Sequence, residues 1–237
     1  MFSIAFAVFL GLGALTLPAS AQSTAPRSPA SNDAPVIFHS ELLDLSFAYP
    51  NSLAPIQLSS PAEQHAEAAR NSAPSANPLL AKINQCTDSA LVALRTDNPD
   101  HPTGASGPVL AAFLHISRVG VDCIPEVLRS DLDGLVSAFA LSRAKGKNLE
   151  SVGDPITYRL GTTVVHLDLA QDIATAGHPP SHYVASAAFL SNGSLVFMNF
   201  DCTDIPFLKR MLSGTITLGK QPPSRFFPPE NAAVSPH

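Results

Sequence analysis

Two apolar runs separated by a polar turn dominate the C-terminal third of the chain. They span 183–190 and 195–200, and an Asn-Gly dipeptide stands between them at 192–193. Asn-Gly is the strongest short-range hairpin signal, because a type I′ turn needs a positive φ at both central residues. Such a turn sets Phe189 opposite Val196, on a face that is apolar throughout.

The other face of this hairpin is apolar near the turn and polar farther from it. In the expected register Ser186 lies opposite Asn199, and Val184 lies opposite Asp201. A half-buried strand alternates strictly between apolar and polar positions, and these strands do not. We therefore predict a sheet that is covered on both faces over most of the hairpin.

Alternation of apolar and polar positions predicts further strands upstream. Leu45, Phe47 and Tyr49 share one face of an early strand, and Pro50 ends it. A second hairpin turns at Gly161. The expected strands lie within 36–49 and at 90–95, 109–119, 156–160 and 163–170.

Helical periodicity and capping residues predict three helices. Ser60 and Glu63 form a capping box at the start of the first. The second has a wide apolar stripe, although Gly134 inside it costs roughly 1 kcal/mol relative to alanine. The expected helices run from Pro61 to about Asn71, from Pro125 to Ala144, and from Thr203 or Asp204 to Gly214. This order predicts an α+β fold, an antiparallel β-sheet flanked by helices on both faces (an α/β/α sandwich).

The composition of the two ends differs from that of the middle. An apolar run from Ile4 to Leu17, followed by the cleavage pattern Ala19-Ser20-Ala21, predicts a secretory signal peptide. We therefore expect a secreted or periplasmic protein of a bacterial envelope. The expected organisation is a signal peptide at 1–21, a flexible Ser/Ala/Pro leader at 22–36, one α+β domain at 37–220 and a Pro-rich disordered tail at 221–237. Within this tail, Phe226-Phe227 could dock on the domain.

Charge narrows the class of partner. The formal net charge is −5, and no basic stripe is present, which argues against nucleic acid. After signal cleavage no apolar run is long enough to span a membrane. We expect no cofactor, and a partner that is either a protein or a small apolar ligand.

The three cysteines predict one disulfide and one leftover thiol in an oxidising compartment. Cys86 and Cys123 flank two strands that are expected to pair, so their ends can meet, and we favour this bridge. Cys202, at the end of the C-terminal hairpin, is the rival partner. No motif of a Cys-His nucleophile surrounds any of the three.

One set of polar residues could support acid–base chemistry. His166 and Asp168 stand two apart on an expected strand, so both side chains point the same way, roughly 7 Å apart, and Arg159 could lie across the strand pair. A histidine with a carboxylate can act in proton transfer or ligate a metal. No nucleophile motif accompanies them, so we prefer a structural polar face held by local hydrogen bonds.

A second set could bind a metal. His178 and His182 stand in the loop before the C-terminal hairpin, but two intervening prolines forbid the helix that would pair them. Zinc sites need three or four well-placed ligands, and the sequence offers a scattered set. The oxygen-rich loop 97–101 lacks the spacing of a calcium loop, and turn chemistry explains it.

The layout resembles a known family of exported domains. An early Leu-x-Phe-x-Tyr-Pro strand at 45–50, a mid-chain amphipathic helix, two meandering hairpins and a short final helix look like the PsbP-like α/β/α sandwich domains. These are binding or assembly factors with no common catalytic set. The resemblance therefore implies an exported non-catalytic binding or assembly protein. The alternative from another class is an exported hydrolase or metal-dependent enzyme that uses His166 and Asp168.

Overall fold

Two antiparallel sheets form the frame of the protein. The computed structural model describes residues 34–71, 82–83, 85–95, 111–146, 149–173 and 180–227. The expected signal peptide, most of the leader, the loop 97–101 and His178 lie outside these ranges. The larger sheet has the strand order β3-β4-β5-β10-β9-β8-β6, with β7 also paired to β8, and the smaller has the order β1-β2-β11-β12.

The bounds of the strands and helices are as follows. The larger sheet contains β3 (Ala54–Ile56), β4 (Thr87–Arg95), β5 (Ala112–Gly120), β6 (Leu149–Ser151), β7 (Ile156–Leu160), β8 (Thr163–Asp172), β9 (Tyr183–Ser191) and β10 (Ser194–Cys202). The smaller sheet contains β1 (Val36–Ser40), β2 (Leu45–Tyr49), β11 (Thr215–Leu218) and β12 (Ser224–Arg225). The helices are α1 (Pro61–Asn71), a 3₁₀ turn η1 (Val121–Cys123), α3 (Glu126–Arg129), α4 (Leu132–Gly146) and α5 (Ile205–Leu212).

The predicted C-terminal hairpin is confirmed in its register. β9 and β10 pair with Phe189 opposite Val196 and Ser186 opposite Asn199. Asn192 has a φ of 43° and Gly193 a φ of 68°, as a type I′ turn requires. This hairpin lies inside the larger sheet, where β5 pairs with β10 and β8 pairs with β9.

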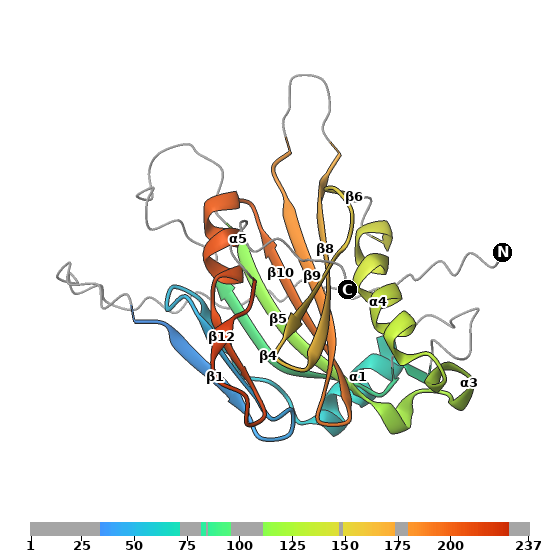
Figure 1. Ribbon diagram of the computed structural model, residues 1–237. Coiled ribbons are helices and arrows are strands. Elements are labelled where there is room, and N and C mark those ends of the chain that lie inside the picture. Colours follow the sequence, from blue (N-terminus) through green and yellow to red (C-terminus); the bar gives the residue numbers. More distant parts are fainter. Residues whose placement is uncertain are drawn as a thin grey trace.

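The larger sheet buries both of its faces, but the layers differ from the expected sandwich. α4 covers one face, where Val136 and Ala140 pack with Ala188 and Leu195. The other face is covered by the smaller sheet together with α5 (Figure 1). The α+β class and the antiparallel pairing are confirmed. The expectation of helix layers on both faces is corrected, because the second cover is largely a sheet. Its inner residues include Leu45, Phe47, Tyr49, Ile216 and Leu218.

The helix expected from Pro125 to Ala144 is interrupted. It forms two helices, α3 and α4, with a turn at Ser130-Asp131 between them. The Asp131 carboxylate accepts a hydrogen bond of 2.9 Å from the Gly134 amide, so Asp131 caps the start of α4. A Cβ at Gly134 would lie 2.2 Å from a carboxylate oxygen of Asp131. The glycine that weakens a continuous helix thus fits the first turn of a new one.

The folded region extends beyond the expected boundary at Lys220. Residues 221–227, which were assigned to the disordered tail, include β12, and Phe226 has an exposed fraction of 0%. The Phe226 ring lies edge-on to Phe47 at 5.7 Å and 5.4 Å from Phe200. It therefore joins the smaller sheet to the larger one.

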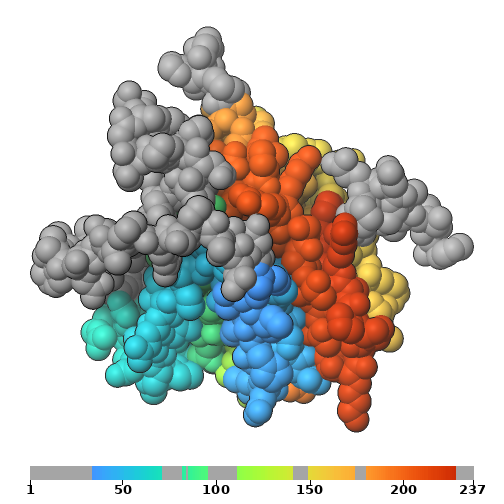
Figure 2. All heavy atoms as spheres, turned by 90° about the vertical axis from the view of Figure 1, so that its left-hand side faces the viewer, coloured from blue at the N-terminus to red at the C-terminus, as the bar shows by residue number. Residues whose placement is uncertain are grey.

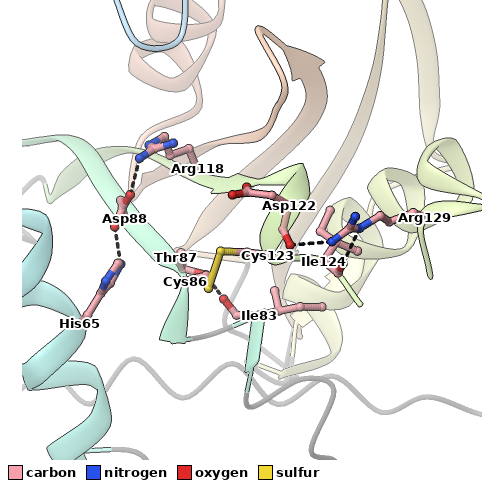
Figure 3. Close-up of a disulfide and its surroundings, with 10 residues drawn as sticks. All are labelled: His65, Ile83, Cys86, Thr87, Asp88, Arg118, Asp122, Cys123, Ile124 and Arg129. Carbon is pink, nitrogen blue, oxygen red and sulfur yellow. Dashed lines mark hydrogen bonds and ion pairs between the residues drawn. A yellow bond between two sulfur atoms is a disulfide. The ribbon is translucent and has the colours of Figure 1, made fainter. Parts of the chain in front are cut away.

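A disulfide ties the start of β4 to the turn after β5. Cys86 and Cys123 are bonded, with Cα atoms 6.1 Å apart (Figure 3). Cys202 is a free buried thiol. Nearby, the Arg129 side chain donates hydrogen bonds to the carbonyl oxygens of Ile124 and Asp122, at 2.7 and 2.6 Å. The bridge and these bonds together fix the chain as it leaves the sheet toward α4.

The position of the disulfide makes its contribution measurable. The bridge closes a separation of 37 residues, so the chain-entropy model gives about 4 kcal/mol of stabilisation. We expect Cys86→Ala/Cys123→Ala to lower the free energy of unfolding by roughly this amount in urea titrations. Reductant should destabilise the wild-type protein similarly and leave the variant unchanged. A variant as stable as the oxidised wild type would contradict this account.

Candidate functional site

A row of buried polar residues crosses four neighbouring strands of the larger sheet. His115 of β5 lies opposite Asn199 of β10, Asn199 lies opposite Ser186 of β9, and Ser186 lies opposite Asp168 of β8. Their exposed fractions are 7%, 6%, 4% and 3%. Ser186 stands two residues before Ala188, which packs under α4, so the row belongs to the α4 face. We call these four residues the polar row.

The polar row is partly satisfied by neighbouring side chains. His115 Nε2 lies 2.9 Å from the Ser89 hydroxyl, and the Ser151 hydroxyl donates to Asp168 at 3.4 Å. The Ser186 hydroxyl is buried and has no hydrogen-bond partner among the described residues. Burial raises the pKa of the Asp168 carboxyl, while the Ser151 hydroxyl and the Leu169 amide oppose that rise. Burial therefore disfavours the charged form of Asp168.

His166 lies next to this row but is paired elsewhere. Its Nε2 atom is 2.9 Å from an Asp133 carboxylate oxygen at the start of α4, and its Nδ1 atom is 3.3 Å from the Thr157 hydroxyl. Asp168 therefore shares a face with His166 without being its partner. Both ring nitrogens are engaged, which orients the imidazole between β7 and α4.

Arg159 is exposed at the border of the same face. It lies opposite Val164 on the β7–β8 hairpin and forms no ion pair with Asp168 among the described residues. A hollow of about 270 Å³ lies beside Val164. Its lining residues are Asp133, Val136, Thr162, Thr163, Val164 and Leu190. The hollow includes the partner of His166 but neither His166 nor Asp168.

His182 forms a separate pair at the far end of the hairpin. Its Nε2 atom contacts the Asp201 carboxylate, and its amide donates to Asp172 at 3.0 Å. Asp172 also accepts from the amide and hydroxyl of Ser181, and these hydrogen bonds lower its pKa. His178 is outside the described residues, so the His178–His182 metal pair stays untested. No three potential metal ligands gather within the described part of the chain.

A charged cluster that the sequence analysis missed anchors α1. Asp88 of β4 binds Arg118 of β5 at 2.8 Å and also contacts His65 of α1 (Figure 3). Next to it, the Gln64 side chain bonds the amide of Ser89 at 2.7 Å and its carbonyl at 3.3 Å. These contacts dock α1 on β4, where the strand is irregular between Ser89 and Leu91. The cluster docks a helix on the sheet, and none of its residues lines the 270 Å³ hollow.

The hydrogen bonds of this region orient its histidine side chains. General acid–base catalysis needs a donor and an acceptor aimed at one reacting atom, and nucleophilic catalysis needs a base within reach of the nucleophile. His115 and His166 of the larger sheet and His182, just before β9, each have their own partner: Ser89 for His115, Asp133 for His166 and Asp201 for His182. Ser186 lies between the Asn199 amide and the Asp168 carboxyl, and no histidine among the described residues bonds its hydroxyl.

The pKa values of Asp168 and Asp172 are shifted in opposite directions, so the pH dependence of stability tests whether the Asp168 carboxyl of the polar row is buried at a cost. A raised pKa in the folded protein means that stability is lost as the pH rises from the ordinary value of 3.8 through the folded value. Asp168→Asn removes this loss, so we expect its stability relative to wild type to improve between pH 4 and pH 7. Urea unfolding at several pH values measures the difference.

Asp172→Asn is the matched control. The folded pKa of Asp172 is lowered, so its ionised form stabilises the fold above the ordinary value, and this gain is lost as the pH falls. We expect this variant to be destabilised near pH 7 and to approach wild type in acid. Parallel pH profiles for the two variants would refute the assignment.

Comparisons with known proteins find similarity among solved structures. No protein-family model and no curated protein sequence matches the chain. The solution structure of cyanobacterial PsbP (CyanoP) from Synechocystis sp. PCC 6803 is similar, with a TM-score of 0.44 and 9% sequence identity. The similarity covers 82% of this chain and 98% of that chain. The resemblance of layout to PsbP-like domains is thus found again in three dimensions, at a level that carries no argument about function.

Proposed function

We propose that this chain is an exported, non-catalytic binding or assembly protein. The observation that carries the proposal is the separate pairing of its acid–base groups. His166 is bonded to Asp133 and Thr157, whereas Asp168 is bonded to Ser151, and neither lines the hollow beside them. Groups that are satisfied in this way stabilise and orient elements of a fold. They are not held ready for a substrate.

Export is supported by the leader pattern and by the cysteines. The N-terminal residues have the features of a signal peptide, and disulfides persist mainly in oxidising compartments outside the cytoplasm. No helix in the described part of the chain has the length and apolar character to cross a bilayer. A secreted or periplasmic protein fits the first two observations.

A protein is the partner that the surface favours. Pockets for small apolar ligands are lined mainly by hydrophobic and aromatic side chains. A second hollow, of about 380 Å³, is lined largely by polar residues: Asp44, Thr163, Leu190, Ser191, Asn192, Leu218, Gly219, Lys220 and Gln221. The 270 Å³ hollow mixes threonines and Asp133 with three aliphatic residues. Neither offers an apolar cavity, so we propose recognition on the outside of the sheets.

The alternative, a hydrolase or metal-dependent enzyme, is not favoured. It requires His166 and Asp168 to act on one substrate, yet their hydrogen bonds lead to different elements. His166 is held by α4 and β7, and Asp168 is held by β6.

A paired experiment separates the two functions. The bait is the mature protein with His166→Gln/Asp168→Asn, substitutions that keep hydrogen-bonding side chains at both positions. Wild type and variant are each used to capture partners from the native envelope by cross-linking, and both are assayed on ester, phosphate and peptide substrates. We expect the same captured partner, with affinities within about threefold, which is less than 1 kcal/mol.

The contradicting result is a catalytic one. Turnover by the wild type that the double variant loses, with circular dichroism showing an intact fold, would establish the enzyme in place of the binding protein.

A further inference from the structure

Most edges of the two sheets carry a device that blocks further strand pairing. In the larger sheet β3 has three residues and contains Pro55, β6 has three residues and contains Glu150, and β7 carries Arg159. In the smaller sheet β12 has two residues and ends in Arg225. Short length, charge and proline are the means by which natural sheets avoid edge-to-edge association.

β1 has neither charge nor proline. Its sequence is Val-Ile-Phe-His-Ser over Val36–Ser40, and it is the longest of the edge strands of the smaller sheet. One side of β1 pairs with β2, and no strand pairs with the other side within the described residues. That side presents a row of main-chain N–H and C=O groups, for which an extended strand is the complementary ligand.

The side chains of β1 leave this edge accessible. Val36 and Phe38 point inward, where they are partly buried against the core. Ile37 points outward and is 67% exposed. The His39 ring bonds the Ser46 hydroxyl of β2 at 2.8 Å, so it lies over the sheet rather than across the edge.

We propose that two copies of this chain associate through antiparallel pairing of β1 with β1, which joins their smaller sheets into one. This inference rests on the proposed function and specifies one mode of assembly. With Phe38 on the two-fold axis, Phe38 lies opposite Phe38 of the second copy. Ile37 then lies opposite His39, and Val36 lies opposite Ser40. Two-fold symmetry is the commonest arrangement of homo-oligomers.

The distribution of charge supports a second copy of this chain as the partner of the β1 edge. The outward face of the smaller sheet bears Ile37, His39, Ser46, Ala48, Thr215, Thr217 and Arg225. Among the described residues, the strands of this face carry no carboxylate, and Glu41 and Asp44 lie in the turn at their end. The whole chain has a net charge of −5, so the copies can approach along these strands with little repulsion. Figure 2 looks onto this side of the molecule, with β1 and β2 in blue and the C-terminal strands in red.

The expected dimer is weak. A five-residue strand pair buries less than the roughly 1,200 Å² of a stable standard interface. We therefore expect sedimentation velocity of the mature wild-type protein to show a shift from monomer to dimer at concentrations on the order of 10 to 100 μM, an affinity typical of small transient interfaces.

Charge variants test the register as well as the edge. Ile37→Lys/His39→Lys sets lysine opposite lysine at both symmetry-related pairs, which should weaken the dimer by roughly tenfold. Ile37→Lys/His39→Glu sets lysine opposite glutamate at the same pairs and should restore association. Val127→Lys on α3 is the control, because Val127 is similarly exposed at 69% and remote in sequence from β1, and it should dimerise like the wild type.

Three results would overturn the inference. The first is a wild-type protein that stays monomeric at 200 μM or more, well above the roughly 100 μM upper end expected for a weak interface. The second is a lysine–lysine variant that dimerises like the wild type. The third is a lysine–glutamate variant that dimerises as weakly as the lysine–lysine variant. A monomeric wild type that still captures an envelope protein would refute strand pairing between copies and leave the proposed binding function standing.

Discussion

The register of the β9–β10 hairpin is the constraint on which the rest of the structure depends. Asn192 and Gly193 both adopt positive φ, and this turn places Phe189 opposite Val196. A slip of one residue would send every side chain of a strand to the other face, because successive residues alternate between faces. The apolar residues that meet the smaller sheet would then face α4. The turn at Asn192-Gly193 therefore decides which side chains pack against α4 and which pack against the smaller sheet.

The same register brings the polar row together. Ser186 and Asn199 belong to the hairpin, and they align with Asp168 and His115 on the flanking strands. Buried polar groups cost stability unless they are hydrogen-bonded, and two of this set, His115 and Asp168, bond a serine of a neighbouring strand. The hairpin is thus a scaffold, and the polar residues beside it belong to that scaffold.

Local signals in the sequence predicted local structure well. The Asn-Gly turn, the alternation of β2 and the Ser60–Glu63 capping box all appear as expected, the last with a 2.8 Å bond from the Ser60 amide to the Glu63 carboxylate. The elements that were missed depend on partners far along the chain. β2 pairs with β11 across about 170 residues, and Asp133 of α4 meets His166 of β8. The periodicity of apolar residues describes one helix or strand at a time, so it carries no information on contacts between residues far apart in the sequence. The interruption at Asp131 escaped prediction because the apolar stripe continues across it.

Amide hydrogen exchange of the mature protein, followed residue by residue, tests the central role of the hairpin most directly. If β9 and β10 form the stable centre of the sheet, their amides should exchange most slowly, at the rate set by global unfolding. The amides of α1, β3 and the unpaired side of β1 should exchange much faster at low protein concentration. Amides of β9 and β10 that exchange as fast as those of the edge strands would contradict this account of the fold.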